Sequence, residues 1–151
     1  MKNYKEAFTL IEALISVAIS AIGFAGVMAL VSTSNTVMND TIDKEKLKFQ
    51  NTEILEALNA DQANIMDYNG KDLSNCTQIT VAVNKDEQLK SLQKWCNKLQ
   101  GEVGSKRSQD KRIIRVEKKK VGQSDVYIVS LELNAKNNKK SVYMKRIFYA
   151  Q

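Results

Sequence analysis

The sequence predicts an α+β protein in which a long N-terminal helix precedes a small head with one helix and an antiparallel β-sheet. Three observations predict this class. Residues 8–31 form an apolar run, and apolar residues then recur at helical spacing to about residue 60. Residues 84–101 have the pattern of a short amphipathic helix. Three segments with alternating apolar and polar residues follow between residues 112 and 150.

The apolar run at residues 8–31 carries a single charge, Glu12. At about 1.5 Å per residue, a helix of this length crosses a bilayer. A carboxylate within such a helix is costly unless it is paired, so Glu12 indicates a function. A secretory signal peptide would account for the polar leader at residues 1–7, and a plain single-pass anchor would account for the length of the run. Neither accounts for Glu12.

The helix is expected to continue beyond the apolar run. After a polar Ser/Thr patch at residues 32–36, apolar residues recur at steps of four and seven, which marks one face of an amphipathic helix. We expect one helix from about Phe8 to near Ala60. Residues 32–68 form its amphipathic continuation, and Asn69-Gly70 is the stop signal. Two helices broken in the Ser/Thr patch are the alternative.

The remaining residues, 69–151, are expected to form the head. The β-branched run at 77–83 predicts a first strand. Asn84 and Glu87 suggest a cap for the following helix, which Gly101 is expected to end, and Trp95 should pack against the sheet. The segments Arg112–Val121, Asp125–Leu133 and Ser141–Ala150 predict an antiparallel meander.

Charge and composition restrict the chemistry of the chain. Residues 1–75 hold six basic and ten acidic residues, whereas residues 76–151 hold seventeen basic and seven acidic ones. Lys2 and Lys5 before the apolar run predict a cytoplasmic N-terminus, with the head in the periplasm or outside the cell. The chain has no histidine, which excludes triads with that residue and the commonest zinc ligand. We therefore expect no enzyme activity, no metal and no cofactor.

The polar leader, the sequence Phe8-Thr9-Leu10-Ile11-Glu12 and the long apolar helix together resemble the prepilin signal of type IV pilins and pseudopilins. The resemblance implies cleavage by a prepilin peptidase between Ala7 and Phe8, and methylation of the new Phe8 amino group. It departs from the family in having Ala7 where glycine normally precedes the cut. Burial of Glu12 in a fibre requires a partner, and the Phe8 ammonium of a neighbouring subunit is the expected one. A Glu12 at headgroup level without a partner is the alternative.

Further residues resemble the PilV class of minor pilins, namely Leu92-Gln93-Lys94-Trp95 in the head and Ile22-Gly23 in the anchor. This resemblance implies a type IV pilin fold, inner-membrane insertion and later incorporation in an extracellular pilus. It also implies a role in priming assembly near the tip, with the major pilin and other minor pilins as partners. A minor pseudopilin of type II secretion is the alternative, as is a tip-exposed adhesin or DNA-capture subunit.

Two features of the head suggest separate roles. Cys76 and Cys96 enclose nineteen residues, and an oxidising compartment favours a disulfide between them over two buried free thiols. A basic segment could bind DNA or an anionic surface, although such charge runs are usually solvated faces. Its residues are Lys106, Arg107, Lys111, Arg112, Arg115, Lys118, Lys119 and Lys120.

Overall fold

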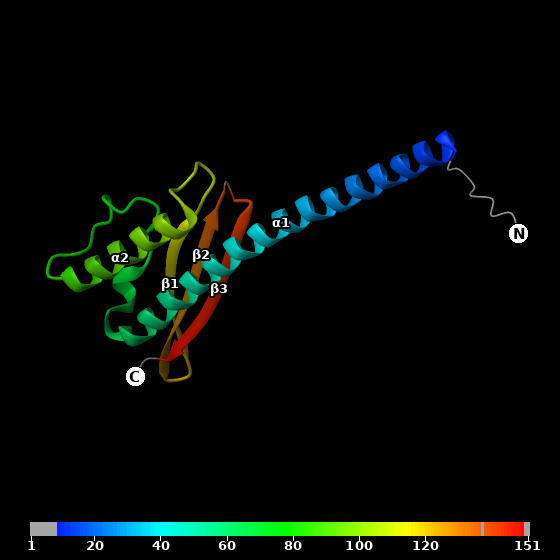
Figure 1. The fold of residues 1–151 in the computed structure, drawn as a ribbon. Helices are drawn as coiled ribbons and strands as arrows, with labels where there is room; N and C mark the ends of the chain where they lie inside the picture. The colour runs from blue at the N-terminus through cyan, green and yellow to red at the C-terminus, as the bar shows by residue number, and fades with distance from the viewer. Residues whose placement is uncertain (1–8, 137, 150–151) are drawn as a thin grey trace, which may run out of the picture. The chain divides into compact units, whose positions relative to one another are not determined.

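The computed structural model describes residues 9–136 and 138–149, and it has the type IV pilin fold (Figure 1). A long N-terminal apolar helix precedes a small head with a helix and a three-stranded antiparallel sheet. The chain divides into two compact units between Asn39 and Asp40, and the second unit, from Asp40 onward, is called the head below. The elements are α1 (Leu10–Ala60), the 3₁₀ helix η1 (Gln62–Tyr68), α2 (Asp86–Val103), β1 (Arg112–Val121), β2 (Ser124–Ala135) and β3 (Lys140–Tyr149).

Helix α1 is continuous through the Ser/Thr patch, so the alternative of two helices is wrong. The Thr33 and Thr36 hydroxyls donate to the carbonyls of Ala29 and Ser32, at 3.0 and 3.1 Å, and so bond within the helix. The α-helix ends at Ala60, and the chain up to Tyr68 adopts the tighter 3₁₀ form instead. Gly70, with φ +72°, follows as the sequence predicted.

The sheet has the order β1-β2-β3, with both pairs antiparallel, which confirms the predicted meander. Ile114, Leu131 and Met144 lie opposite one another in the register and belong to or pack against the core. Gly122 and Gln123 make the two-residue turn between β1 and β2. Gly122 has φ +65°, as the first position of a type II′ hairpin turn requires.

The predicted strand at residues 77–83 is wrong, because this segment is irregular. Residues 70–73 take the edge of β1 instead: Leu73 N donates to Arg112 O at 2.7 Å, and Ile114 N donates to Lys71 O at 3.0 Å. The first residues of β1 therefore already have a backbone partner on that side. Within the irregular loop, Ile79 is buried and Val83 is exposed, so the alternating pattern matches no sheet face.

Helix α2 differs from its prediction at both ends. Asn84 lies outside it with φ +66°, and the N-cap is Lys85, whose side chain makes no capping hydrogen bond. The helix passes through Gly101 and ends before Gly104, whose φ of +85° suits glycine. Its buried side has the predicted residues, Leu92, Cys96 and Leu99.

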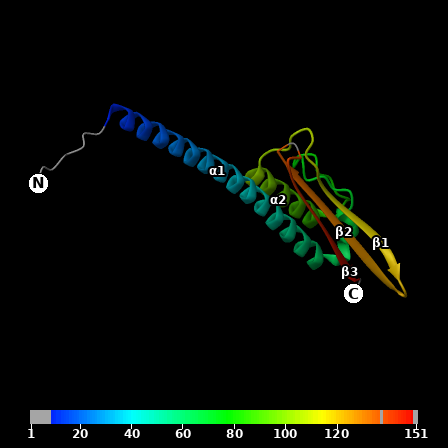
Figure 2. The same cartoon turned by 90° about the vertical axis from the view of Figure 1, so that its right-hand side faces the viewer.

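In the head, the part of α1 after Asp40 and α2 cover the same face of the sheet (Figure 2). The core between them combines Ile54 and Leu58 of α1 with Leu92 of α2 and Leu131 of β2. Trp95 joins this core against η1, where its ring centre lies 5.7 Å from that of Tyr68. The sequence predicted that Trp95 packs against the sheet; Trp95 belongs to the same buried core as Leu131 of β2 and has a further ring contact with Tyr68.

Candidate functional site

The first turn of α1 contains a reciprocal hydrogen-bonded cap between Thr9 and Glu12. The Thr9 backbone N–H and the Thr9 hydroxyl both donate to Glu12 Oε2, each at 2.9 Å. The Glu12 N–H lies 3.4 Å from Thr9 Oγ1. This is a capping box, with Thr9 at the N-cap and the glutamate at the third helical position. Glu12 therefore fixes the point at which the apolar helix begins.

Sequence reasoning treated Glu12 as an assembly residue only and missed Thr9. The pattern Thr-x-x-Glu directly before an apolar run is a recognised helix-start signal and could have identified this residue. Glu12 Oε1 has no hydrogen-bond partner among residues 9–136 and 138–149. The cap thus leaves one carboxylate oxygen able to accept a further bond. Ala7 and Phe8, at the expected cleavage point, lie outside the described residues.

The apolar part of α1 is suited to lipid. By length and composition this helix could cross a membrane, and its large side chains are exposed, such as Leu10 and Phe24 at 78% and 71%. Ser16 and Ser20 donate to the carbonyls four residues earlier, at 2.7 and 2.8 Å. These hydroxyls are therefore satisfied within the helix, as a hydrocarbon environment demands.

Cys76 and Cys96 form a disulfide, which confirms the prediction. The bond ties the irregular chain before residue 77 to the buried side of α2. Because the expected strand at 77–83 is absent, this disulfide joins a loop to a helix and not a strand to a helix.

The predicted basic patch does not form one surface. Arg112 is fully buried, where its Nη2 donates to Gly104 O at 2.8 Å and its Nε lies 3.4 Å from Asn134 O. Burial lowers the pKa of Arg112, and the nearby Asp110 and Asp72 act in the opposite direction. Its inclusion in a surface patch is therefore wrong: the even-numbered residues at the start of β1 face the core.

Several other basic residues of this segment already have acidic partners. Lys118 pairs with Asp125 at 2.7 Å, Lys106 with Asp72 at 3.5 Å and Lys111 with Glu132 at 4.0 Å. Arg115, Lys119 and Lys120 remain exposed without an ion pair among the described residues, and the same holds for Arg107 in the preceding loop. Only part of the segment is thus available to a ligand.

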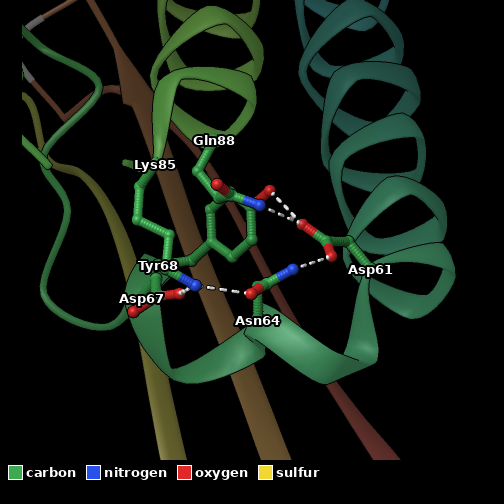
Figure 3. Close-up of polar contacts among 6 residues, drawn as sticks. All are labelled: Asp61, Asn64, Asp67, Tyr68, Lys85 and Gln88. Carbon is green, nitrogen blue, oxygen red and sulfur yellow. Dashed lines mark hydrogen bonds and ion pairs between the residues drawn. The ribbon is translucent and has the colours of Figure 1, made fainter. Parts of the chain in front are cut away.

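A polar cluster, which the sequence analysis did not identify, joins the end of α1 to η1 and α2 (Figure 3). Asp61 accepts hydrogen bonds from Tyr68 Oη at 2.8 Å, Gln88 Nε2 at 3.0 Å and Asn64 Nδ2 at 2.7 Å. Lys85 bridges Asn64 Oδ1 at 2.6 Å and Asp67 at 2.9 Å. The cluster has no sequence pattern of its own, because Lys85 and Gln88 lie 21 and 27 residues along the chain from Asn64 and Asp61, the side chains that they bind.

The electrostatics of this cluster keep Asp61 ionised. Burial by itself raises the pKa of Asp61, but the hydrogen bonds from Asn64, Gln88 and Tyr68 and the charge of Lys85 outweigh burial and leave the pKa below its usual value. Burial, reinforced by Asp61, raises the pKa of Tyr68, so its hydroxyl remains a donor. These contacts hold η1 and the start of α2 to the residue that follows α1, which is a structural role.

Comparison with known proteins supports the reading of the N-terminal segment. Residues 2–28 match the family model described as the prokaryotic N-terminal methylation motif. Comparisons with curated proteins and with solved structures give no match. The motif indicates a type IV pilin-like or pseudopilin-like protein, and it implies processing by a prepilin peptidase and assembly with other pilins. The matched span includes Thr9 and Glu12, the two residues of the cap.

Proposed function

We propose that this chain is a minor pilin of PilV type that takes part in priming or assembly of a type IV pilus near its tip. The observation that carries the proposal is the methylation motif at residues 2–28, which covers most of the exposed apolar part of α1, together with a disulfide-bonded head. Its role is structural: a peptidase acts on it, and it catalyses nothing itself. Its partners are the major pilin and other minor pilins.

In this proposal the prepilin peptidase cuts between Ala7 and Phe8 and methylates the Phe8 amino group. The chain is inserted in the inner membrane with its N-terminus in the cytoplasm and its head in the periplasm. Assembly then moves the apolar helix from lipid into the fibre, where Glu12 pairs with the Phe8 ammonium of a neighbour. The free Oε1 of Glu12 allows this pairing without loss of the Thr9 cap.

The test of processing is mass analysis of the N-terminus of the mature protein. A methylated Phe8 as the first residue is the expected result. An N-terminus that retains residues 1–7, or one formed by cleavage within the apolar run, would contradict the proposal. A type II secretion pseudopilin would give the same N-terminus. A deletion strain separates these systems, because loss of pili with normal protein secretion is expected only of the minor pilin.

The test of the charge pair uses Glu12→Leu. We expect normal membrane insertion and a strong loss of the protein from purified fibres, because the Phe8 ammonium would be buried without a partner. Immunoblots of membrane and sheared-fibre fractions measure both. Thr9→Ala is the matched control, since it removes the hydroxyl of the cap and keeps the carboxylate. Equal defects in both variants would assign Glu12 to helix capping alone, and normal incorporation of Glu12→Leu would refute the pairing.

A further inference from the structure

The outer face of the β-sheet, on the side opposite the two helices, combines apolar and unpaired basic side chains. We propose that it is a docking surface for an acidic protein other than a second copy of this chain. The surface, here called the outer face, consists of Arg115, Lys119, Ile128, Lys145, Ile147 and Tyr149. The proposed function involves the anchor helix, and this inference adds a second interface, on the head.

Strand register brings these residues together. Lys119 lies opposite Val126, which lies opposite Tyr149. In the next rows outward-facing Ile128 is paired with Ile147, and Ser130 with Lys145. Successive residues of a strand point to opposite sides, and the alternate set, such as Leu131 and Phe148, is in the core. The outer face is therefore one contiguous surface across three strands.

The centre of the outer face is apolar. Ile147 and Tyr149 are 54% and 67% exposed, although both are large apolar side chains. Val126 lies between Lys119 and Tyr149 in the strand register. It is buried, yet it does not belong to the hydrophobic core of the head. The neighbouring side chains of the outer face thus already cover Val126 from outside. This apolar centre within a charged surround has the anatomy of a protein–protein interface.

The charges around this centre lack partners. Arg115, Lys119 and Lys145 are exposed and have no ion pair among the residues that the structure describes. Glu117, opposite Ile128, is an exposed carboxylate on the same face, so the unpaired charges there are three positive and one negative. In the head, nine carboxylates are paired with basic side chains. The three cations of the outer face are therefore free to attract an anionic partner, which charge complementarity would steer and orient.

The charges and side chains of the outer face also indicate which kind of partner binds there. A second copy offers few free carboxylates, because the nine ion pairs already use most of those in the head. Single-stranded nucleic acid prefers adjacent aromatic platforms on which successive bases stack. The two exposed tyrosines on this side of β3, Tyr143 and Tyr149, are instead separated by Lys145 and Ile147. A protein surface with apolar residues inside an acidic rim fits both properties.

The test uses the full chain in detergent micelles. The probes are the other proteins of the same genome that carry the N-terminal methylation motif, purified in the same detergent and sorted by the net charge of their heads. This choice of probes rests on the proposed function. We expect at least one acidic probe to bind, and expect Lys119→Glu/Lys145→Glu and Ile147→Ser each to raise its Kd by about tenfold.

Matched controls make the test specific. Lys48→Glu/Lys94→Glu makes the same charge change at exposed positions on α1 and α2, and Val83→Ser removes an apolar side chain that is 88% exposed in a loop. Both controls should leave Kd unchanged. Equal weakening by the controls, or binding that the outer-face variants do not change, would overturn the proposal.

The other occupants are outcomes of the same experiment. Dimerisation that Ile147→Ser abolishes, measured by sedimentation, would overturn the proposal in favour of a second copy. Binding of oligothymidylate that the same variants abolish would overturn it in favour of nucleic acid. Absence of binding to any probe would overturn it while Phe8 methylation stands, whereas an unmethylated N-terminus would refute the proposed function itself.

Discussion

At the scale of single residues, Asp61 is the acceptor that holds the end of α1 to η1 and α2. Three side chains donate to its two oxygens. An asparagine there has one acceptor oxygen, so Asp61→Asn must leave at least one of these donors without its bond. We expect a loss of about 1–3 kcal/mol in the free energy of unfolding. Urea titration followed by the fluorescence of Trp95, which contacts Tyr68, measures it.

The control for this prediction is Asp86→Asn. Asp86 is exposed at the start of α2, so its replacement should change stability by less than about 0.5 kcal/mol. Equal stabilities of the Asp61 and Asp86 variants would show that the cluster contributes nothing specific.

Single residues also show where sequence reading succeeds. Glu12 was identifiable because a charge in an apolar run stands out in the pattern itself. Arg112 was misread as a surface residue, because its burial depends on two carbonyls from other elements, Gly104 O at the end of α2 and Asn134 O in β2. Asp61 gave no signal for the same reason: its donors come from two elements, η1 and α2. Local pattern predicts charge and period but not tertiary hydrogen bonds.

At the scale of elements, the disulfide replaces the missing strand as the constraint on residues 77–83. This loop has no place in the sheet, and Cys76 fixes one end of it to α2. We expect Cys76→Ser/Cys96→Ser to lower the free energy of unfolding by about 3 kcal/mol, from the entropy of closing the loop. Denaturant titration of the oxidised protein and of the variant measures the difference.

A reductant provides the control for this prediction. It should lower the stability of the natural chain and leave that of the serine variant unchanged. Limited proteolysis should then cut first within residues 77–83, where no strand pairing protects the backbone. Initial cleavage within β2, or equal stability with and without reductant, would contradict the assigned role.

The elements also explain why most of the fold was predictable. The strand bounds at Arg112–Val121 agree with the pattern, and β2 and β3 differ by one or two residues at their ends. Each of these strands follows its neighbour through a short connection, so local alternation and nearby turns suffice. The run at 77–83 has the same local pattern, but residues 70–73 occupy the edge of β1 that it would need. Competition for an edge is a tertiary effect.

At the scale of the whole molecule, opposite charges in distant parts of the chain hold the head together. Asp40 and Asp43, at the start of the head on α1, pair with Lys140 and Lys136 of the β2–β3 hairpin. Glu53 of α1 pairs with Lys98 of α2. The acidic first half and the basic second half of the sequence are thus partly explained by ion pairs within the head.

The acid stability of the head follows from these carboxylates. The hydrogen bond from Lys140 lowers the pKa of Asp40, and that from Lys118 lowers the pKa of Asp125. The pKa of Asp61 is also lowered. A carboxyl group with a depressed folded pKa stabilises the protein above its unfolded value, and this contribution disappears as pH falls through the folded value. The chain has no histidine to titrate nearer neutrality.

We therefore expect the free energy of unfolding to be nearly constant between about pH 7 and pH 5 and to fall below about pH 4. The usual aspartate pKa of 3.8 marks where the loss begins, because all three folded values lie beneath it. Urea titrations across this range measure the profile. Asp40→Asn/Asp125→Asn should flatten it at low pH, since those carboxylates no longer take up protons. A decline centred near pH 6, or an unchanged slope in that variant, would show that other groups control the stability of the head.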